Sequence, residues 1–320
     1  MTARAIRWLT GTLLITVAGA ALAAVPAKVL IVLSRDSGAY EQVVQAVRAE
    51  LAVQKRTELD ITTQLVDDYG ATGRAPILPP TLIITVGAEA ARRVAQTNPA
   101  APILHTLLPR ETALEILHIG RGGKAAKFRD SAIFLDQPIG RQVDLLRLAL
   151  PSHKRVAVIL GPSTRHQEPE LRAAARERSL ILNVTTLVQR EDLLPALEKL
   201  LDDNDILFSV AEPFAYNSET IHHLLLTTYR YKIPVMGLSK SYVDAGALFA
   251  IYSTPEQIGR QVAQLLMAQP IVKGFSLPIP SYPKYFLISV NRRVAASLDL
   301  FLDTESTLQR KLEALPPPSQ

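Results

Sequence analysis

The stretch Lys28-Val29-Leu30-Ile31-Val32-Leu33, followed by Ser34-Arg35-Asp36-Ser37-Gly38, decides the fold class of this chain. Its apolar run is rich in β-branched residues and does not alternate with polar ones, as is typical of a strand covered on both faces. After the polar turn, apolar residues return at helical spacing, at Val43, Val44, Val47 and Leu51. This order predicts a parallel sheet with helices packed on it.

The same pair of signals recurs along the chain. Apolar runs at 82–86, 156–160 and 206–210 are each followed by a segment with helical periodicity, at 88–95, 171–178 and 218–229. A further buried strand is expected at 234–238. Regular alternation of strand and helix predicts an α/β fold with parallel sheets.

Three breaks in composition divide this alternation. The Gly-rich basic stretch at 120–128 places a lobe boundary near 131–137, and a proline-rich stretch lies at 274–283. Between them, Thr254-Pro255-Glu256-Gln257 is typical of a helix start, with Thr as the N-cap and Pro at the first helical position. Three connections between two α/β lobes predict a hinged clamp, although such breaks also occur in the loops of single domains.

We therefore expect two Rossmann-like lobes with parallel sheets, joined by three crossovers. Lobe 1 is expected at 24–134 plus 253–275, and lobe 2 at 135–252 plus 276–300. Residues 301–320 are expected to form a partly disordered C-terminal tail, because its end is rich in proline.

Residues 1–23 have the pattern of a cleaved signal peptide. Arg4 and Arg7 precede an uncharged apolar run at 9–22, and Ala21-Leu22-Ala23 offers a small-x-small cleavage site. The run is shorter than the ~20 residues that span a bilayer comfortably, although a retained membrane anchor is the alternative. The chain has no cysteine, which excludes a cysteine-linked lipid and any disulfide. We expect an exported, periplasmic protein with no lipid anchor and no membrane span after cleavage.

Composition and motifs argue against several other classes of protein. A net charge of +5 over 320 residues is too weak and dispersed to indicate nucleic-acid binding. Gly237-Leu238-Ser239-Lys240-Ser241 resembles a nucleophile elbow, but it lacks the last glycine and no histidine follows His223. Glu219, His222 and His223 lack further metal ligands nearby, and no glycine-rich nucleotide motif is present. We therefore expect no enzymatic activity, no metal and no cofactor.

Ligands of parallel α/β sheets bind beyond the carboxyl ends of the strands, next to helix N-termini that attract anions. The loops in these positions supply the candidate ligand-binding residues, which are Ser34, Asp36, Ser37, Gly87, Ala88 and Arg110 in the first lobe, Asp136 at a crossover, and Ser163, Glu212, Tyr216, Asn217, Ser239 and Tyr242 in the second lobe. Structural roles are the alternatives: Ser34, Ser37 and Asp136 as helix caps, and Gly87 as a tight turn.

Several motifs carry a resemblance to a known family. They are Tyr231-Lys232-Ile233-Pro234-Val235-Met236-Gly237-Leu238-Ser239, the following 242–248, the helix opening Ile258-Gly259-Arg260-Gln261-Val262-Ala263, and Ser289-Val290-Asn291-Arg292-Arg293-Val294-Ala295. In this order and spacing, residues 28–300 resemble the ABC transporter substrate-binding proteins that include the TrpX-like, aromatic-amino-acid-binding members.

The resemblance implies a type I periplasmic-binding-protein fold and the delivery of a small polar ligand to an inner-membrane ABC permease. It also implies cleft contacts at Ser34, Asp36, Gly87, Asp136, Asn217 and Ser239. The chain departs from the family at 105–115, where Thr106-Leu107-Leu108-Pro109-Arg110 replaces an aspartate-proline-valine element, so Arg110 is expected to select an anionic group. A periplasmic ligand-sensing subunit coupled to a membrane signalling partner is the alternative function.

Overall fold

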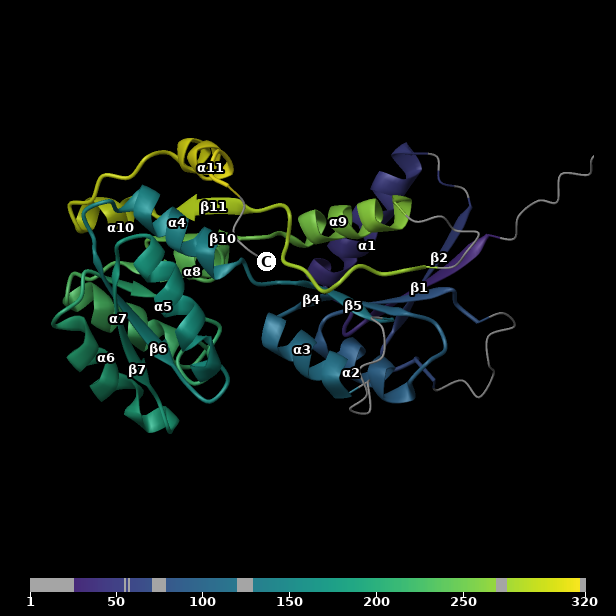
Figure 1. The fold of residues 1–320 in the computed structure, drawn as a ribbon, viewed down its shortest axis with the longest axis horizontal. Coiled ribbons are helices and arrows are strands. Elements are labelled where there is room, and N and C mark those ends of the chain that lie inside the picture. The colour runs from purple at the N-terminus through teal and green to yellow at the C-terminus, as the bar shows by residue number, and fades with distance from the viewer. Residues whose placement is uncertain are drawn as a thin grey trace, which may run out of the picture.

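The computed structural model describes residues 26–54, 56, 58–70, 79–119, 129–268 and 275–316. The predicted signal peptide at 1–23, the basic stretch at 121–128 and the last four residues lie outside this part of the chain. Two sheets, each flanked by helices, form two lobes that follow one another along the long axis of the molecule (Figure 1). This confirms the predicted α/β class with two mostly parallel sheets.

The first lobe contains a five-stranded parallel sheet in the order β2-β1-β3-β4-β5. Its strands are β1 (Ala27–Leu33), β2 (Leu59–Leu65), β3 (Leu82–Val86), β4 (Ile103–Leu108) and β5 (Ser131–Phe134). Helices α1 (Gly38–Val53) and α9 (Pro255–Met267) cover one face, and α2 (Ala88–Thr97) and α3 (Arg110–Ile119) cover the other (Figure 1).

The apolar run of β1 is buried because both of its faces carry helices. Val29 and Ile31 pack with α1 and α9, whereas Val32 packs with α2. Helix α9 approaches α1 so closely that a Cβ atom on Gly259 would collide with the carbonyl oxygen of Val43. Glycine at this position therefore fixes a segment from late in the chain onto the first lobe.

The second lobe contains a six-stranded sheet in the order β11-β10-β9-β8-β6-β7, in which only β11 is antiparallel to its neighbour. Its strands are β6 (Arg155–Leu160), β7 (Ile181–Thr186), β8 (Ile206–Phe208), β9 (Val235–Gly237), β10 (Phe249–Tyr252) and β11 (Leu287–Val290). Its helices are α4 (Ile139–Ala149), η1 (Arg165–Gln167), α5 (Glu168–Glu177), η2 (Arg190–Asp192), α6 (Leu193–Leu201), α7 (Ile221–Arg230), α8 (Lys240–Ala245), α10 (Arg292–Ser297) and α11 (Glu305–Glu313).

The C-terminal part of the chain differs from the sequence prediction in two places. Residues 305–313, expected within a partly disordered tail, form α11, whose Leu308 and Leu312 are buried in the core of the second lobe. The segment around Ser281, assigned to the second lobe, instead bonds to β5 in the first lobe: Phe134 N donates to Ser281 O and Ser281 N donates to Ala132 O, each at 2.9 Å.

The chain passes between the lobes at 135–138, 253–254 and 283–286, and a buried chain of hydrogen bonds joins the three passages. Gln137 Nε2 donates to Ser253 Oγ at 2.8 Å, and Ser253 Oγ donates to the Tyr285 carbonyl at 2.5 Å. Arg141 Nη1 donates to Gln137 Oε1 at 2.7 Å and to Pro283 O at 2.9 Å. Each passage thus contributes at least one polar group to a single junction.

The predicted helix start at Thr254 lies directly after the second passage and is confirmed. Gln257 N donates to Thr254 Oγ1 at 3.2 Å, and Thr254 N donates to Gln257 Oε1 at 3.0 Å. This capping box, with Pro255 in the first turn, sets the direction in which the chain re-enters the first lobe.

We expect Gln137→Ala to lower the free energy of unfolding by about 1–3 kcal/mol, because the buried Ser253 hydroxyl loses its donor and Arg141 loses an acceptor. Urea unfolding followed by circular dichroism measures this. Gln45→Ala, at an exposed position of α1, is the control and should change the free energy by less than about 0.5 kcal/mol. Equal effects of the two substitutions would contradict a junction built on Gln137.

A second prediction concerns His105 on β4, which is 1% exposed, with Nδ1 2.8 Å from Thr85 Oγ1. Burial lowers the pKa of His105 to about 4, against the opposing charge of Asp130. An unfolded histidine titrates near ~6.5. Between these two values the unfolded chain binds a proton that the folded chain does not, so stability falls as the pH falls.

His105 should therefore contribute a loss of roughly 1.4 kcal/mol in unfolding free energy for each pH unit between pH 6.5 and 4. His105→Gln should remove that part of the slope, whereas His222→Gln, at an exposed position of α7, should keep it. Urea unfolding at a series of pH values measures both slopes. An unchanged slope in His105→Gln would show that His105 is not held neutral.

Candidate functional site

A cavity of about 240 Å³ lies between the two lobes, beside the chain passages. Its first-lobe side is formed by Pro109, Arg110 and Tyr282, and the passage 135–137 forms its base. The second lobe supplies the remaining lining residues, which are Ile139, Gln142, Gln167, Val210, Ala211, Leu238, Ser239, Tyr242 and Ile251. Of the predicted ligand-binding residues, this cavity brings together Arg110, Asp136, Ser239 and Tyr242.

Most of the cavity wall is apolar. The apolar residues are Leu135 in the passage and Ile139, Val210, Leu238 and Ile251 in the second lobe. Such a wall favours the apolar part of a ligand, while a few convergent polar groups set its orientation.

Asp136 is the half-buried carboxylate that lines the cavity. Its Oδ2 accepts a hydrogen bond of 2.5 Å from the backbone N–H of Arg110, the first residue of α3. Burial raises the pKa of Asp136 and the charge of Glu111 raises it further, whereas backbone hydrogen bonds and the charge of Arg110 lower it. In the described part of the chain, no side chain donates a hydrogen bond to this carboxylate or forms an ion pair with it.

The guanidinium of Arg110 is engaged by other groups. Its Nη1 lies 3.3 Å from Glu111 Oε1 and 3.6 Å from Glu170 Oε2, and its Cζ lies 6.0 Å from the centre of the Tyr282 ring. Tyr282 also meets Phe134 edge to face at 5.3 Å, and burial raises the pKa of Tyr282 to about 12. Arg110 is therefore neutralised by two glutamates, which does not favour its predicted role in selecting an anion.

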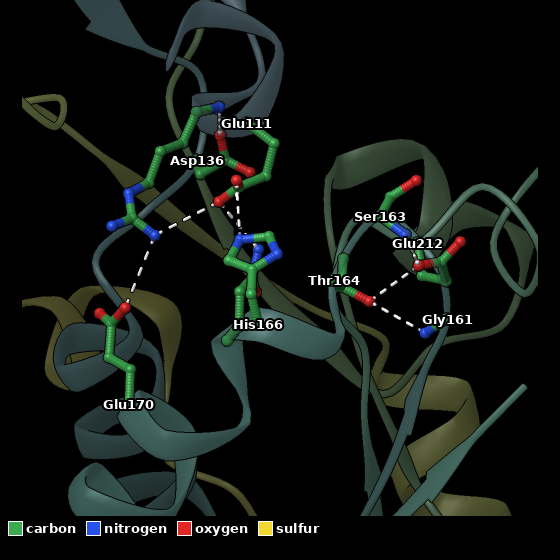
Figure 2. A network of polar contacts seen from close by, with 10 residues as sticks. Glu111, Asp136, Gly161, Ser163, Thr164, His166, Glu170 and Glu212 are labelled. Carbon is green, nitrogen blue, oxygen red and sulfur yellow. Dashed lines mark hydrogen bonds and ion pairs between the residues drawn. The ribbon is translucent and has the colours of Figure 1, made fainter. Parts of the chain in front are cut away.

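Side chains of the two lobes meet directly at the edge of the cavity, and we call these contacts the clasp (Figure 2). Glu111 on α3 lies 2.7 Å from His166 Nε2, and Gln167 Nε2 donates to Glu111 Oε1 at 3.3 Å. Together with the pair of Arg110 and Glu170, these contacts join α3 of the first lobe to η1 and α5 of the second. Sequence reasoning did not identify Glu111, His166 or Glu170.

Glu212, a predicted ligand-binding residue, does not line the cavity and instead bonds to two loops of the second lobe. It is fully buried, and its Oε2 accepts hydrogen bonds from Thr164 Oγ1 at 2.8 Å and from Ser163 N at 3.2 Å (Figure 2). Its Oε1 accepts from Phe214 N at 3.1 Å. These bonds fasten the loop after β6 to the loop after β8, so Glu212 and the exposed Ser163 shape the rim of the lobe without lining the cavity.

Asn217 and Tyr216 also lie away from the cavity lining. The Asn217 side chain donates to Pro213 O at 2.7 Å and accepts from the backbone N–H groups of Glu219 and Thr220, which orders the turn before α7. The Tyr216 ring is buried in the lobe core, burial raises its pKa, and its carbonyl accepts from the Tyr242 hydroxyl at 3.2 Å. These residues support Tyr242, which does line the cavity.

Ser34 and Gly87, two predicted ligand-binding residues at the ends of β1 and β3, lie at the N-terminus of α2 and cap it. Ser34 Oγ accepts from Ala90 N at 2.9 Å, and a Cβ on Gly87 would lie 2.6 Å from that oxygen. Gly87 has a φ of 91° and N-caps the helix that Ala88 begins, and Ser37 N-caps α1. Together with the exposed Asp36, they lie at the carboxyl edge of the first sheet and do not line the cavity. Ser34 and Gly87 match the structural alternatives of a cap and a tight turn, whereas the Ser37 side chain makes no capping hydrogen bond.

No helix in the described ranges is long and apolar enough to cross a membrane. Within the same ranges, no group of three or more His, Asp or Glu side chains could hold a metal ion.

The model of the ABC transporter substrate-binding protein family matches residues 135–305, which is more than half of the chain. The chain belongs to this family. The match covers the second lobe, the passages between the lobes and the cavity lining from Leu135 onward. No curated protein matches the chain.

Solved structures share the fold of this family member. One is a ligand-free, open substrate-binding protein with adhesive properties from Clostridium difficile, with 15% identity, a TM-score of 0.65, and coverage of 87% of this chain and 96% of that one. Another is a protein from Streptococcus pneumonia in complex with L-Trp, with 13% identity, a TM-score of 0.58, and coverage of 89% and 98%. A conserved domain protein from Vibrio cholerae has 18% identity and a TM-score of 0.59, with coverage of 89% and 98%. At these identities the likeness shows the fold alone.

We expect Glu111→Gln to shift the protein toward a more open arrangement, because it removes the charge that meets both His166 and Arg110. The ratio of open to closed molecules should rise roughly two- to five-fold, since partly exposed ion pairs contribute ~0.2–1 kcal/mol. The chain has no cysteine, so dyes on Ala49→Cys and Glu198→Cys, one exposed site in each lobe, report the change by single-molecule energy transfer.

Glu115→Gln is the matched control, because Glu115 is exposed one turn further along α3. It should leave the distribution of distances unchanged. Identical distributions for the wild type and Glu111→Gln would show that the clasp does not hold the lobes together.

Proposed function

We propose that this protein is the solute-binding component of an ABC-type transporter, that it is exported to the periplasm, and that it delivers a small ligand to a membrane permease without performing chemistry on it. The observation that carries the proposal is the cavity formed jointly by both lobes and by the passage at 135–137. A ligand held there touches both lobes at once, so binding favours the arrangement in which the lobes are closed.

The geometry supports capture by a hinge motion. The passages are short and lie together at the junction, while the opposite lobe surfaces meet through the clasp. Rotation about the junction would separate Pro109 and Arg110 from Val210 and Ala211 across the cavity. A ligand that contacts both pairs shifts the population toward closure by its difference in affinity for the two states.

The family supports a permease as the partner, and the L-Trp complex among proteins of the same fold supports a small organic molecule as cargo. The sequence pattern at 1–23 supports export. The apolar wall and the half-buried Asp136 support a ligand with both an apolar and a polar part. The volume lies just below the lower end of small-molecule sites, ~300 Å³, which supports a compact ligand.

The test is a thermal-shift screen of the protein against amino acids, amines, organic acids, sugars and nucleosides, followed by calorimetry on any ligand found. A ligand at ~100 times its dissociation constant should stabilise the fold by about 2.7 kcal/mol. Ala211→Trp should abolish the effect, because the indole would fill the cavity that the exposed Ala211 lines.

Ala49→Trp, at an exposed position of α1 away from the cavity, should keep the full stabilisation. If no class of solute stabilises the wild type, or if Ala211→Trp leaves the response intact, the cavity is not a solute-binding site.

A further inference from the structure

Resting on the proposed function, we propose that the ligand is a compact organic cation, a protonated amine on an apolar body that carries no carboxylate, and that Asp136 binds the ammonium group. The chemical class of the ligand follows from which charged groups around the cavity already have partners of opposite charge.

Two cations at the cavity edge, Arg110 and Lys240, are already matched by carboxylates, and Arg141 behind Gln137 donates to the Gln137 side chain and to Pro283 O. Arg110 lies between Glu111 and Glu170, and His166 contacts Glu111. Lys240, which follows the cavity residue Ser239, forms a 2.7 Å ion pair with Asp244. Among the described residues, Asp136 is left as the cavity carboxylate without an ion-pair contact, and the charge of Arg110 acts on it only weakly because two glutamates already contact that guanidinium.

The positive end of α3 is already occupied as well. A helix N-terminus ordinarily attracts the anionic group of a ligand. Here the backbone N–H of Arg110 donates to Asp136 at 2.5 Å, so the carboxylate fills the position that a ligand carboxylate would take. A second negative group at this place would meet Asp136, Glu111 and Glu170 together, and like charges disfavour one another.

Three hydroxyl-bearing side chains line the cavity, Ser239, Tyr242 and Tyr282, and the first two already have partners within the second lobe. The Tyr242 hydroxyl donates to the Tyr216 carbonyl, and Ser239 Oγ lies 2.7 Å from Ser241 Oγ. The rest of the wall is mostly apolar, with Leu135, Val210 and Ile251 among its members. The cavity therefore matches a ligand with one cationic end and one apolar end.

Burial already raises the pKa of Asp136 in the absence of a partner. An ammonium group at hydrogen-bond distance favours the ionised carboxylate and opposes that rise. Binding of the ammonium group and ionisation of Asp136 therefore favour each other. An anionic ligand would instead disfavour the ionised carboxylate.

The experiment compares probes that share one aromatic body and differ in charge: 2-phenylethylamine, phenylalanine, 3-phenylpropionate and 2-phenylethanol. Two aliphatic amines, isoamylamine and cyclohexylamine, vary the body. Binding to the intact protein is measured by calorimetry at neutral pH. We expect amines to bind and phenylalanine and 3-phenylpropionate to bind at least about ten-fold more weakly, as expected for loss of a charge-assisted hydrogen bond.

Asp136→Asn is the decisive variant, because an amide oxygen can still accept the N–H of Arg110 while the negative charge is gone. It should weaken amine binding about 10- to 100-fold. Asp130→Asn is the matched control: Asp130 Oδ1 likewise accepts a backbone N–H, from Ile103 at 2.9 Å, but it lies away from the cavity. It should leave amine affinity unchanged, and circular dichroism should show both variants folded.

Tighter binding of the zwitterion or the anion, equal affinity of Asp136→Asn for amines, or no binding of any amine in the series would overturn the inference. None of these results contradicts the proposed function if another solute binds and Ala211→Trp abolishes that binding. Failure of every solute class in the thermal-shift screen would instead remove the proposed function itself.

Discussion

The hydrogen-bond chain from Gln137 through Ser253 to the Tyr285 carbonyl is the constraint on which the rest of this structure depends. The two lobes have separate sheets and largely separate cores, so their relation is set where the chain passes between them. Gln137 and Ser253 are 4% and 6% exposed, and buried polar groups need partners to avoid a desolvation cost. Satisfying them requires all three passages to lie together, which also brings the ends of the lobes face to face.

The site follows from this junction because Asp136 directly precedes Gln137 in the first passage. A change in lobe angle must alter the backbone of 135–138, and that segment carries both a cavity wall and the half-buried carboxylate of Asp136. The clasp closes the same cavity from the other side. Its charged side chains are 29–50% exposed, and they are those of Arg110, Glu111, His166 and Glu170. Such pairs contribute little, ~0–1 kcal/mol each, so the clasp biases the lobe angle without fixing it. A ligand bridging the cavity can therefore decide the equilibrium.

The parts of the fold that were predictable are those with a strong local signal. Buried parallel strands such as β1 and β3 are continuous apolar runs, and the capping box at Thr254 depends only on neighbouring residues. Strand β2 was missed because Leu59–Leu65 is half exposed at the sheet edge and lacks such a run. Helix α11 was missed because it is short and its burial rests on Leu308 and Leu312 meeting a distant core. The rule that ligands bind beyond the strand ends selected Asp136, Ser239 and Tyr242, which line the cavity. It also selected Ser34 and Glu212, whose side-chain oxygens accept hydrogen bonds from other residues of their own lobes. Cavity wall residues such as Val210 and Ile251 cannot be distinguished by sequence from ordinary core residues.

The local charge of the site also could not follow from composition, since the chain as a whole carries +5. What matters is which charges are paired, and pairing depends on tertiary distances such as those between Arg110 and the glutamates of two different lobes. A half-buried carboxylate without an ion-pair contact is costly, and an acid in a cleft whose pKa is shifted by burial is a candidate for a functional site. At Asp136 the cost is limited by the backbone N–H of α3, which holds the carboxylate in position before any ligand arrives. The first lobe thus presents a preorganised acceptor, and the second lobe supplies the apolar surface that closes over it.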